Sequence, residues 1–247
     1  YPNGNLAAQV LGFVGTDDKG LDGLEMVLDD ELKGGIQKEL VATDRKGNAI
    51  FGSVLSKYLP DKGKSVTLTI DASIQFIAER ALDKAMEDTG AKHASVIVMD
   101  PKTGEILAMA NRPTYDPNHY SQGSEEDFKN IAVTNLYEPG STFKPIIASA
   151  ALASGKWKLD QVYNDKGSFA ANGHVMQNWN GEGYGPVRLI DILKFSINTG
   201  MAEIGTTTGA DILSKYVRNY GFGSKTGIEL PGEGDGILYN PDDMSKL

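Results

Sequence analysis

The sequence has no cysteine among its 247 residues, which excludes disulfides, thiolate metal ligands and a cysteine nucleophile. It has only three histidines, His93, His119 and His174, and no H-E-x-x-H pattern, so we expect neither a metal site nor a cofactor. No apolar run approaches the roughly 18 to 20 residues that a membrane helix needs. We therefore expect no membrane segment in this chain.

Positive charge is also scarce. Lysine and arginine number 24 against 33 aspartates and glutamates, which gives a net charge of −9. Binding to nucleic acid without sequence preference needs a basic surface, so we expect no nucleic-acid partner. Hydrophobic residues make up 40% and charged residues 23%, a mixture typical of globular proteins rather than of disordered or fibrous chains.

The composition divides the chain near residues 58–64, a polar stretch that contains both proline and glycine. The segment before it contains many glycines and shows no long periodic helix. We predict a small irregular module at 1–63 and a second domain at 64–247.

The second domain carries clear signals for helices and strands. Asp71 suits a helix N-cap, and apolar residues then recur at helical spacing until Gly90 supplies a stop. The order of these elements, a strand, a helix, a hairpin and then several helices, indicates an α+β fold with helices packed on an antiparallel sheet. The predicted elements are strands at 66–70, 94–99 and 105–110, and helices at 72–89, near Ser141, at 187–194 and at 210–220.

Ser141 and Lys144 form the most informative pair in the sequence. Pro139 and Gly140 precede Ser141, so this serine lies at or just inside a helix start. Residues three apart share a helix face, so the Lys144 amine can reach the Ser141 hydroxyl. A serine becomes a nucleophile beside a base, and a lysine can serve if burial lowers its pKa. Alone, S-x-x-K is usually an N-capping serine followed by a solvated lysine.

A second polar pair, Ser196 and Asn198, follows later in the chain. A hydroxyl and an amide on one short turn can relay a proton and hold a substrate amide. The combination of S-x-x-K with S-D-N and K-T-G is the signature of penicillin-binding proteins and class A β-lactamases. Here Ile197 replaces the Asp of S-D-N, at the position that supplies neither polar group.

With these motifs the whole chain resembles a class B penicillin-binding protein, the monofunctional D,D-transpeptidase of peptidoglycan synthesis. Residues 1–4, 7–15 and 20–25 are similar to the end of the family's non-catalytic pedestal. The resemblance therefore assigns 1–63 to the C-terminal part of that pedestal or dimerisation domain and its linker. Residues 100–110 resemble the first catalytic hairpin. The remaining matches are at 178–180, 185–186 and 226–233.

The resemblance implies a partial penicillin-binding or serine β-lactamase-like transpeptidase fold at 64–247. It implies that Ser141 is the acylated nucleophile, Lys144 its base, Ser196 the proton relay, and Asn198 the group that orients the substrate amide. The backbone N–H of Ser141 would form half of the oxyanion hole. The implied reaction attacks the D-Ala-D-Ala bond of a stem peptide, releases D-alanine and passes the acyl group to a neighbouring amine.

The resemblance also implies partners and a location. Peptidoglycan stem peptides are the implied substrates, and β-lactams, which resemble D-Ala-D-Ala, would trap the same serine. Division or elongation proteins are expected to contact the parent protein. That parent is expected on the extracytoplasmic face of the bacterial membrane, anchored by an N-terminal helix outside this chain.

The family's third motif, K-T-G on an edge strand, normally lies well beyond the match at 226–233. One K-T-G triplet, 102–104, falls in the predicted hairpin turn, and the other, 225–227, overlaps that match. We assign neither to the third motif. We therefore interpret the chain as ending before it, and expect the 247 residues alone to acylate slowly or not at all.

Other functions remain open at this point. A β-lactam sensor domain is acylated but signals instead of catalysing, and class D β-lactamases also contain Ser-Thr-Phe-Lys. The pedestal-like start, and Asn198 where the class D family has an apolar residue, disfavour both. Spacing alone does not exclude a Ser-His-Asp triad, because triads assemble in space, but nothing selects one of the three histidines.

Overall fold

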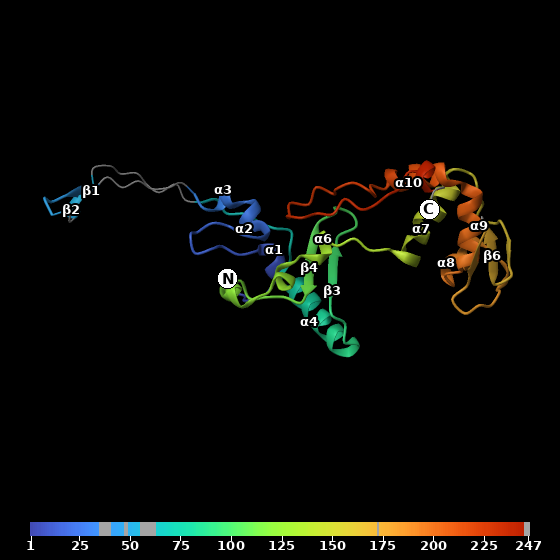
Figure 1. Cartoon of the computed structure of the whole chain (residues 1–247), viewed down its shortest axis with the longest axis horizontal. Coiled ribbons are helices and arrows are strands. Elements are labelled where there is room, and N and C mark those ends of the chain that lie inside the picture. The colour runs from blue at the N-terminus through green and yellow to red at the C-terminus, as the bar shows by residue number, and fades with distance from the viewer. Residues whose placement is uncertain (35–40, 47–48, 55–62, 172, 245–247) are drawn as a thin grey trace. The chain divides into compact units, whose positions relative to one another are not determined.

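The computed structural model describes residues 1–34, 41–46, 49–54, 63–171 and 173–244 (Figure 1). It divides into two compact units, which we call the N-terminal unit (Tyr1–Asn135 with Ile228–Glu233) and the C-terminal unit (Leu136–Gly227 with Gly234–Leu247). Most of the predicted break at 58–64 lies outside the described residues, so the domain boundary at 63/64 stays a prediction.

The N-terminal unit contains one long helix, several short helices and two antiparallel hairpins. Its helices are α1 (Ala8–Leu11), α2 (Gly23–Val27), α3 (Asp29–Leu32), α4 (Ala72–Thr89), α5 (Glu125–Phe128) and α6 (Ile131–Thr134), with the 3-10 helix η1 (Pro117–Gln122). Its strands are β1 (Val41–Thr43), β2 (Ala49–Val54), β3 (Ala94–Met99) and β4 (Ile106–Arg112).

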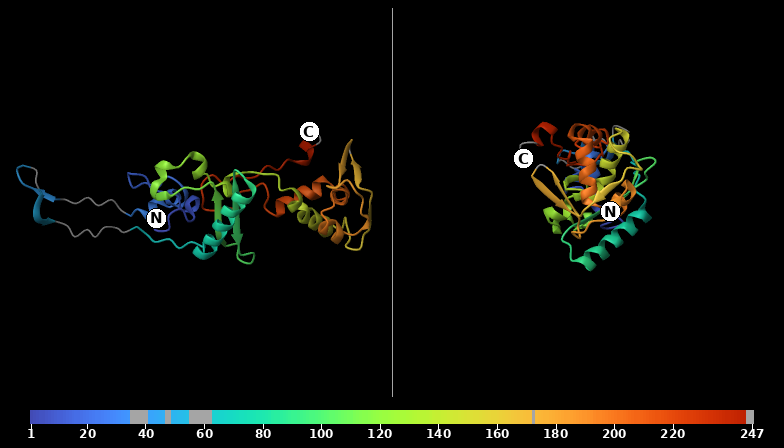
Figure 2. Two further views of the ribbon diagram at one scale, coloured as in Figure 1. Left: turned by 90° about the horizontal axis from the view of Figure 1, so that it is seen from below. Right: turned by 90° about the vertical axis from the view of Figure 1, so that its right-hand side faces the viewer.

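Helix α4 and the β3–β4 hairpin form as the sequence predicts. The Asp71 side chain accepts hydrogen bonds from two backbone N–H groups in the first turn of α4, and Gly90 ends the helix at a left-handed φ of 67°. Strand β3 pairs antiparallel with β4, and α4 lies along this hairpin (Figures 1 and 2). Local capping and turn chemistry therefore explain this part of the fold.

A buried polar side chain connects α4 to β4. Gln75 is completely buried, and its Nε2 donates to Met109 O at 2.9 Å and to Glu79 Oε1 at 2.8 Å. Its Oε1 accepts from the Met109 N–H at 2.8 Å. Glu79 Oε1 also accepts from the Ala7 N–H at 2.8 Å, so the start of the chain joins the same network.

Gln75→Ala is expected to lower the free energy of unfolding by about 2 to 4 kcal/mol, because it leaves the N–H and C=O of Met109 buried without these partners. Denaturation in urea measures the loss. Glu87→Ala, on the exposed side of the same helix, is the matched control and should change stability by less than about 0.5 kcal/mol. Equal small effects for the two variants would contradict a structural role for the network.

Residues 66–70 do not form the strand that their composition predicts. Two hydrogen bonds join the end of this segment to β4, from Thr69 Oγ1 to Ile106 O at 2.6 Å and from the Asp71 N–H to Leu107 O at 2.9 Å. A strand needs a continuing ladder of backbone hydrogen bonds with a neighbour. A β-rich composition indicates that a segment fits a half-buried sheet surface, and it does not supply the neighbour.

The C-terminal unit packs helices beside two small antiparallel ladders, β5–β8 and β6–β7. Its helices are η2 (Gly140–Phe143), α7 (Lys144–Ala153), α8 (Leu189–Lys194), α9 (Asn198–Thr208), α10 (Ala210–Asn219) and α11 (Pro241–Met244). Its strands are β5 (Tyr163–Asp165), β6 (Ser168–Ala171), β7 (His174–Gln177) and β8 (Gly185–Val187). The helices predicted near Ser141 and within 187–194 and 210–220 are confirmed, and so is the α+β class.

Helix α9 stands at the centre of this unit. Its buried residues Met201 and Ile204 belong to a hydrophobic cluster with Ile192 of α8 and Ala148 of α7. The β6–β7 hairpin also contacts α9, and its strand β6 is drawn beside this helix in Figure 1. The N-terminus of α9 is thereby held between other elements, and this is where the predicted site residues lie.

The described residues also bear on membrane association. Within that part of the chain, no helix has both the length and the apolar character that crossing a bilayer requires.

Candidate active site

The four predicted site residues come from two places in the C-terminal unit. Gly140, at a left-handed φ of 58°, opens η2, and Ser141 is the next residue of that short helix. Lys144 is the first residue of α7. Ser196 lies between α8 and α9, and Asn198 is the first residue of α9.

The structure brings the four side chains together. Lys144 Nζ donates to Ser196 Oγ at 2.9 Å, to Ser196 O at 2.8 Å and to Asn198 Oδ1 at 2.7 Å. Ser196 Oγ in turn donates to Ser141 Oγ at 3.0 Å. The spacing suggests that Lys144 reaches Ser141 directly, but in the structure the Ser196 hydroxyl stands between them.

Burial changes the acid–base behaviour of Lys144. Its ammonium is partly removed from water, and this desolvation lowers its pKa from the usual 10.5. A lowered pKa makes the neutral amine more accessible near physiological pH. The geometry therefore offers a serine hydroxyl connected through a second hydroxyl to a base.

Ser196 adopts an unusual backbone conformation. Its φ is 53°, in the left-handed region that residues other than glycine seldom occupy. The strain coincides with its hydrogen bonds to both Ser141 and Lys144. Strained positions of this kind gather at active sites, where surrounding contacts hold them.

The amide of Asn198 is oriented from a neighbouring strand. Its Nδ2 donates to the main-chain carbonyl of Gln177 at 3.1 Å, while its Oδ1 accepts from Lys144. One N–H of this amide remains for a further acceptor. The hydrogen bond uses the backbone carbonyl of Gln177, which a sequence motif does not reveal.

A pocket of about 390 Å³ opens beside these residues. Lys144, Gln177 and Asn198 line it, together with Met176 and Met201 among others. Two of the four predicted site residues, Lys144 and Asn198, therefore line a concave surface of the unit, the kind of surface at which small molecules and peptides bind.

The two K-T-G triplets have no strand structure. Residues 102–104 form the turn between β3 and β4, where the Lys102 N–H donates to Asp100 Oδ1 at 2.8 Å. Residues 225–227 are irregular, and the Lys225 side chain lies 3.8 Å from Asp235. Neither has the edge-strand structure of the family's third motif.

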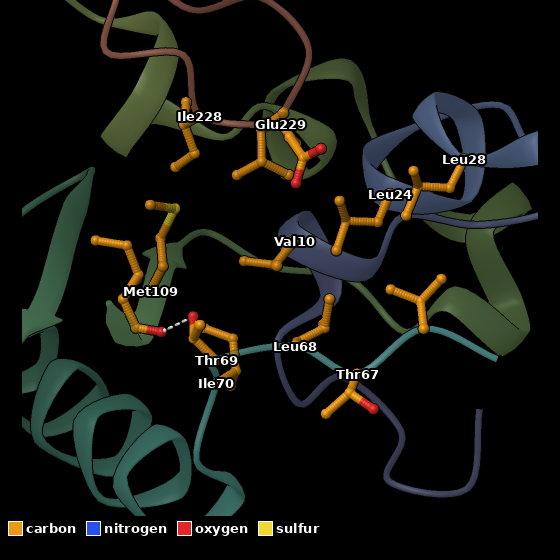
Figure 3. A pocket seen from close by; sticks show the side chains of 13 residues that line it. Val10, Leu24, Leu28, Thr67, Leu68, Thr69, Ile70, Met109, Ile228 and Glu229 are labelled. Atoms are coloured by element: carbon orange, nitrogen blue, oxygen red, sulfur yellow. Dashed lines mark hydrogen bonds between the residues drawn. The ribbon is translucent and has the colours of Figure 1, made fainter. Parts of the chain in front are cut away.

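A second pocket, in the N-terminal unit, is apolar and has a volume of about 210 Å³. Figure 3 shows the 13 side chains that line it, among them Val10, Leu24, Met109 and Ile228. Of these described side chains Glu229 alone carries a charge, so the pocket has no nucleophile paired with a base.

Two of the three histidines, His93 and His119, lie in the unit that does not contain the serine site. His119 Nδ1 lies 3.1 Å from Asp116 and His93 Nε2 lies 3.9 Å from Glu126, both in the N-terminal unit. Ser141 and Ser196 bond to each other, and Lys144 bonds to Ser196. The geometry thus favours a serine–lysine arrangement over a Ser-His-Asp triad. Among the described residues, no group of three or more His, Asp or Glu could hold a metal ion.

Comparison with known proteins identifies the family of this chain. The family described as the penicillin binding protein transpeptidase domain matches residues 94–246. The chain belongs to this family. Its relatives place it with the class B penicillin-binding proteins, which confirms the resemblance seen in the sequence.

Three similar proteins illustrate the match. Stage V sporulation protein D of Bacillus subtilis is 40% identical over 242 residues, which cover 97% of this chain and 37% of the relative. The probable peptidoglycan D,D-transpeptidase PenA of Neisseria gonorrhoeae is 38% identical over 247 residues, which cover 97% of this chain and 41% of the relative. Penicillin binding protein 3 of Mycobacterium tuberculosis, solved in complex with aztreonam, has a TM-score of 0.81 at 32% identity, covering 98% of this chain and 50% of that one.

The chain spans about two fifths of the length of these two curated relatives. The family match runs from β3 to the end of the C-terminal unit and so includes all four residues of the candidate site. For a penicillin-binding transpeptidase, a serine connected to a lysine is the arrangement that the signature motifs describe.

Proposed function

We propose that this penicillin-binding protein is a peptidoglycan D,D-transpeptidase that works through an acyl-enzyme on Ser141. The observation that carries the proposal is the hydrogen-bonded chain from Lys144 through Ser196 to Ser141. The printed name of the PenA relative states the same activity for that protein.

Acylation follows from this geometry. Ser141 Oγ attacks the carbonyl carbon of the penultimate D-alanine, and its proton passes to Ser196 Oγ while the proton of Ser196 passes to neutral Lys144 Nζ. The backbone N–H of Ser141 is one donor to the oxygen that becomes negative. When the C–N bond breaks, the same path returns a proton to the leaving amine of D-alanine, and an ester on Ser141 remains.

Transfer reverses the proton movement. An amine of a second stem peptide attacks the ester carbonyl, gives its proton to Lys144 through Ser196, and forms the new amide bond as Ser141 Oγ leaves and is reprotonated. The free N–H of the Asn198 amide is placed to bind a carbonyl of the donor peptide. Its other hydrogen bonds, to Gln177 and Lys144, fix its direction.

The proposal extends to ligands, location and partners. β-Lactams would acylate Ser141 as analogues of D-Ala-D-Ala, in keeping with the aztreonam complex of the similar Mycobacterium tuberculosis protein. Because peptidoglycan lies outside the cytoplasmic membrane, we place the protein on the extracytoplasmic face, held by a membrane anchor outside these 247 residues. Contacts with division or elongation proteins belong to the same proposal.

Labelling with a fluorescent penicillin tests the proposal. Peptide mass mapping of the labelled full-length protein is expected to place the adduct on Ser141, because this hydroxyl is connected through Ser196 to Lys144. An adduct on Ser196 would contradict the assignment. An adduct that is hydrolysed within seconds, with free penicilloic acid accumulating, would instead indicate a class D-like β-lactamase.

A further inference from the structure

Asp165 is a buried carboxylate that no motif identifies. It ends β5, and only 3% of its surface is exposed. Its partners are neutral donors. Oδ1 accepts from Thr199 Oγ1 at 2.6 Å and from the Gly167 N–H at 2.9 Å, and Oδ2 accepts from Asn178 Nδ2 at 2.8 Å and from the Tyr184 N–H at 2.9 Å.

The four donors decide the charge of this group. Burial raises the pKa of Asp165, but the hydrogen bonds from Thr199, Gly167, Tyr184 and Asn178 outweigh burial and hold the pKa below its usual value. Asp165 is therefore an ionised carboxylate that accepts four hydrogen bonds. A buried charge balanced by neutral donors is costly unless every hydrogen bond is made, so this cluster has a well-defined geometry.

The Oδ1 atom of Asp165 holds the start of α9 through Thr199. Thr199 is completely buried and follows Asn198 directly in the sequence. Its hydroxyl is held by Asp165, and its backbone N–H donates to Asn178 Oδ1 at 3.2 Å. The first turn of the helix that carries Asn198 is thereby fixed.

The Oδ2 atom of Asp165 holds Asn178, next to the strand β7 that contacts Asn198. Asn178 is held by Asp165 and directly follows Gln177, whose carbonyl accepts from Asn198 Nδ2 at 3.1 Å. Thr199, which follows Asn198 on α9, and Asn178, which follows the Gln177 carbonyl bound by Asn198, are thus both held by the Asp165 carboxylate.

We propose that Asp165 is a positioning residue for acyl transfer, which orients Asn198 through Thr199 on α9 and through Asn178, the residue that directly follows β7. The proposal rests on the proposed function, because it concerns the rate at which Ser141 is acylated. Asp165 does not touch the reacting atoms and acts through Asn198.

Asp165→Asn tests the proposal. An amide at this position turns its N–H₂ group toward the backbone N–H of either Gly167 or Tyr184, and because both of these groups can only donate, one of the two hydrogen bonds is lost. We expect the second-order rate constant for acylation by a labelled penicillin to fall about tenfold, because small displacements of positioning groups are costly in rate. Titration of active sites restricts the measurement to folded protein, and Asp211→Asn, at an exposed aspartate of α10, is the matched control.

A double-mutant cycle separates positioning from general destabilisation. In an Asn198→Ala background, Asp165→Asn is expected to slow acylation by less than about twofold, because the residue through which it acts is gone. A tenfold loss in both backgrounds would show that Asp165 acts elsewhere. An unchanged rate in the single variant would overturn the proposal as well.

Thr199 supplies a second pair of variants if Asp165→Asn does not fold. Thr199→Val keeps the shape but removes the hydroxyl, and should slow acylation several-fold, whereas Thr199→Ser should restore the wild-type rate. Wild-type rates for both variants would overturn the proposal. The proposed function fails separately, because it fails when the wild-type protein forms no adduct on Ser141.

Discussion

Lys144→Ala is expected to lower the rate constant for acylation of Ser141 by about 10²-fold or more, the typical contribution of a general base. The variant leaves Ser196 Oγ with no amine to receive the proton that it takes from Ser141. Stopped-flow measurement with a labelled penicillin gives the rate, and Lys156→Ala, at an exposed lysine, is the control. A rate within a few-fold of wild type would contradict the role of Lys144.

Two further measurements separate the basicity of Lys144 from its positive charge. Lys144→Arg retains a cation but cannot accept a proton, so it should be as slow as Lys144→Ala. In the wild-type protein, burial lowers the pKa of Lys144, so its deprotonated form becomes populated at a pH below the usual 10.5. The acylation rate should therefore rise with pH and level off before 10.5, and this rise should be absent from both variants.

Ser196→Ala is expected to lower the acylation rate by about 10²-fold, because it removes the hydroxyl between Ser141 and Lys144. We expect the backbone of the variant to keep the left-handed φ of 53° that Ser196 adopts. The rate and the melting temperature should be measured on the same preparation, so that loss of folded protein is not taken for loss of catalysis.

Ser196→Gly separates the hydroxyl from the strained backbone. Glycine adopts a left-handed φ without a steric cost, so this variant should be no less stable than Ser196→Ala. We nevertheless expect the same slow acylation, because both variants lack the hydroxyl. Near-normal acylation by Ser196→Gly would show that Lys144 reaches Ser141 without the relay.

The elements that the sequence predicts correctly depend on local chemistry. Asp71 caps α4 with its own side chain, Gly90 ends the same helix, and Gly140 opens η2 at a left-handed φ. Each of these outcomes requires only a few neighbouring residues. For the same reason the start of α7 at the S-x-x-K motif is predictable from the sequence.

Helix α9 could not be predicted in this way. It contains Gly200, Gly205 and four threonines, Thr199 and Thr206–Thr208, all poor helix formers. It forms because Met201 and Ile204 are buried against other helices. Residues 66–70 show the opposite case. Their composition predicts a strand, but the strand does not form because composition does not supply a partner strand.

The site shows the same division between local and long-range information. The spacing of Ser141 and Lys144 identifies a possible pair, but the position of Ser196 between them depends on how α8 and α9 pack against α7. Asp165 lacks a sequence signal altogether, because its function depends on donors that come from four separate positions.

The three hydrogen bonds of Lys144 determine where its lone pair points after deprotonation. Two of its acceptors, Ser196 O and Asn198 Oδ1, are carbonyl oxygens that cannot donate a proton. The third, Ser196 Oγ, is a hydroxyl that can. The neutral amine keeps its bonds to the two carbonyls and turns its lone pair toward the hydroxyl, so the base meets its proton donor without a change of rotamer.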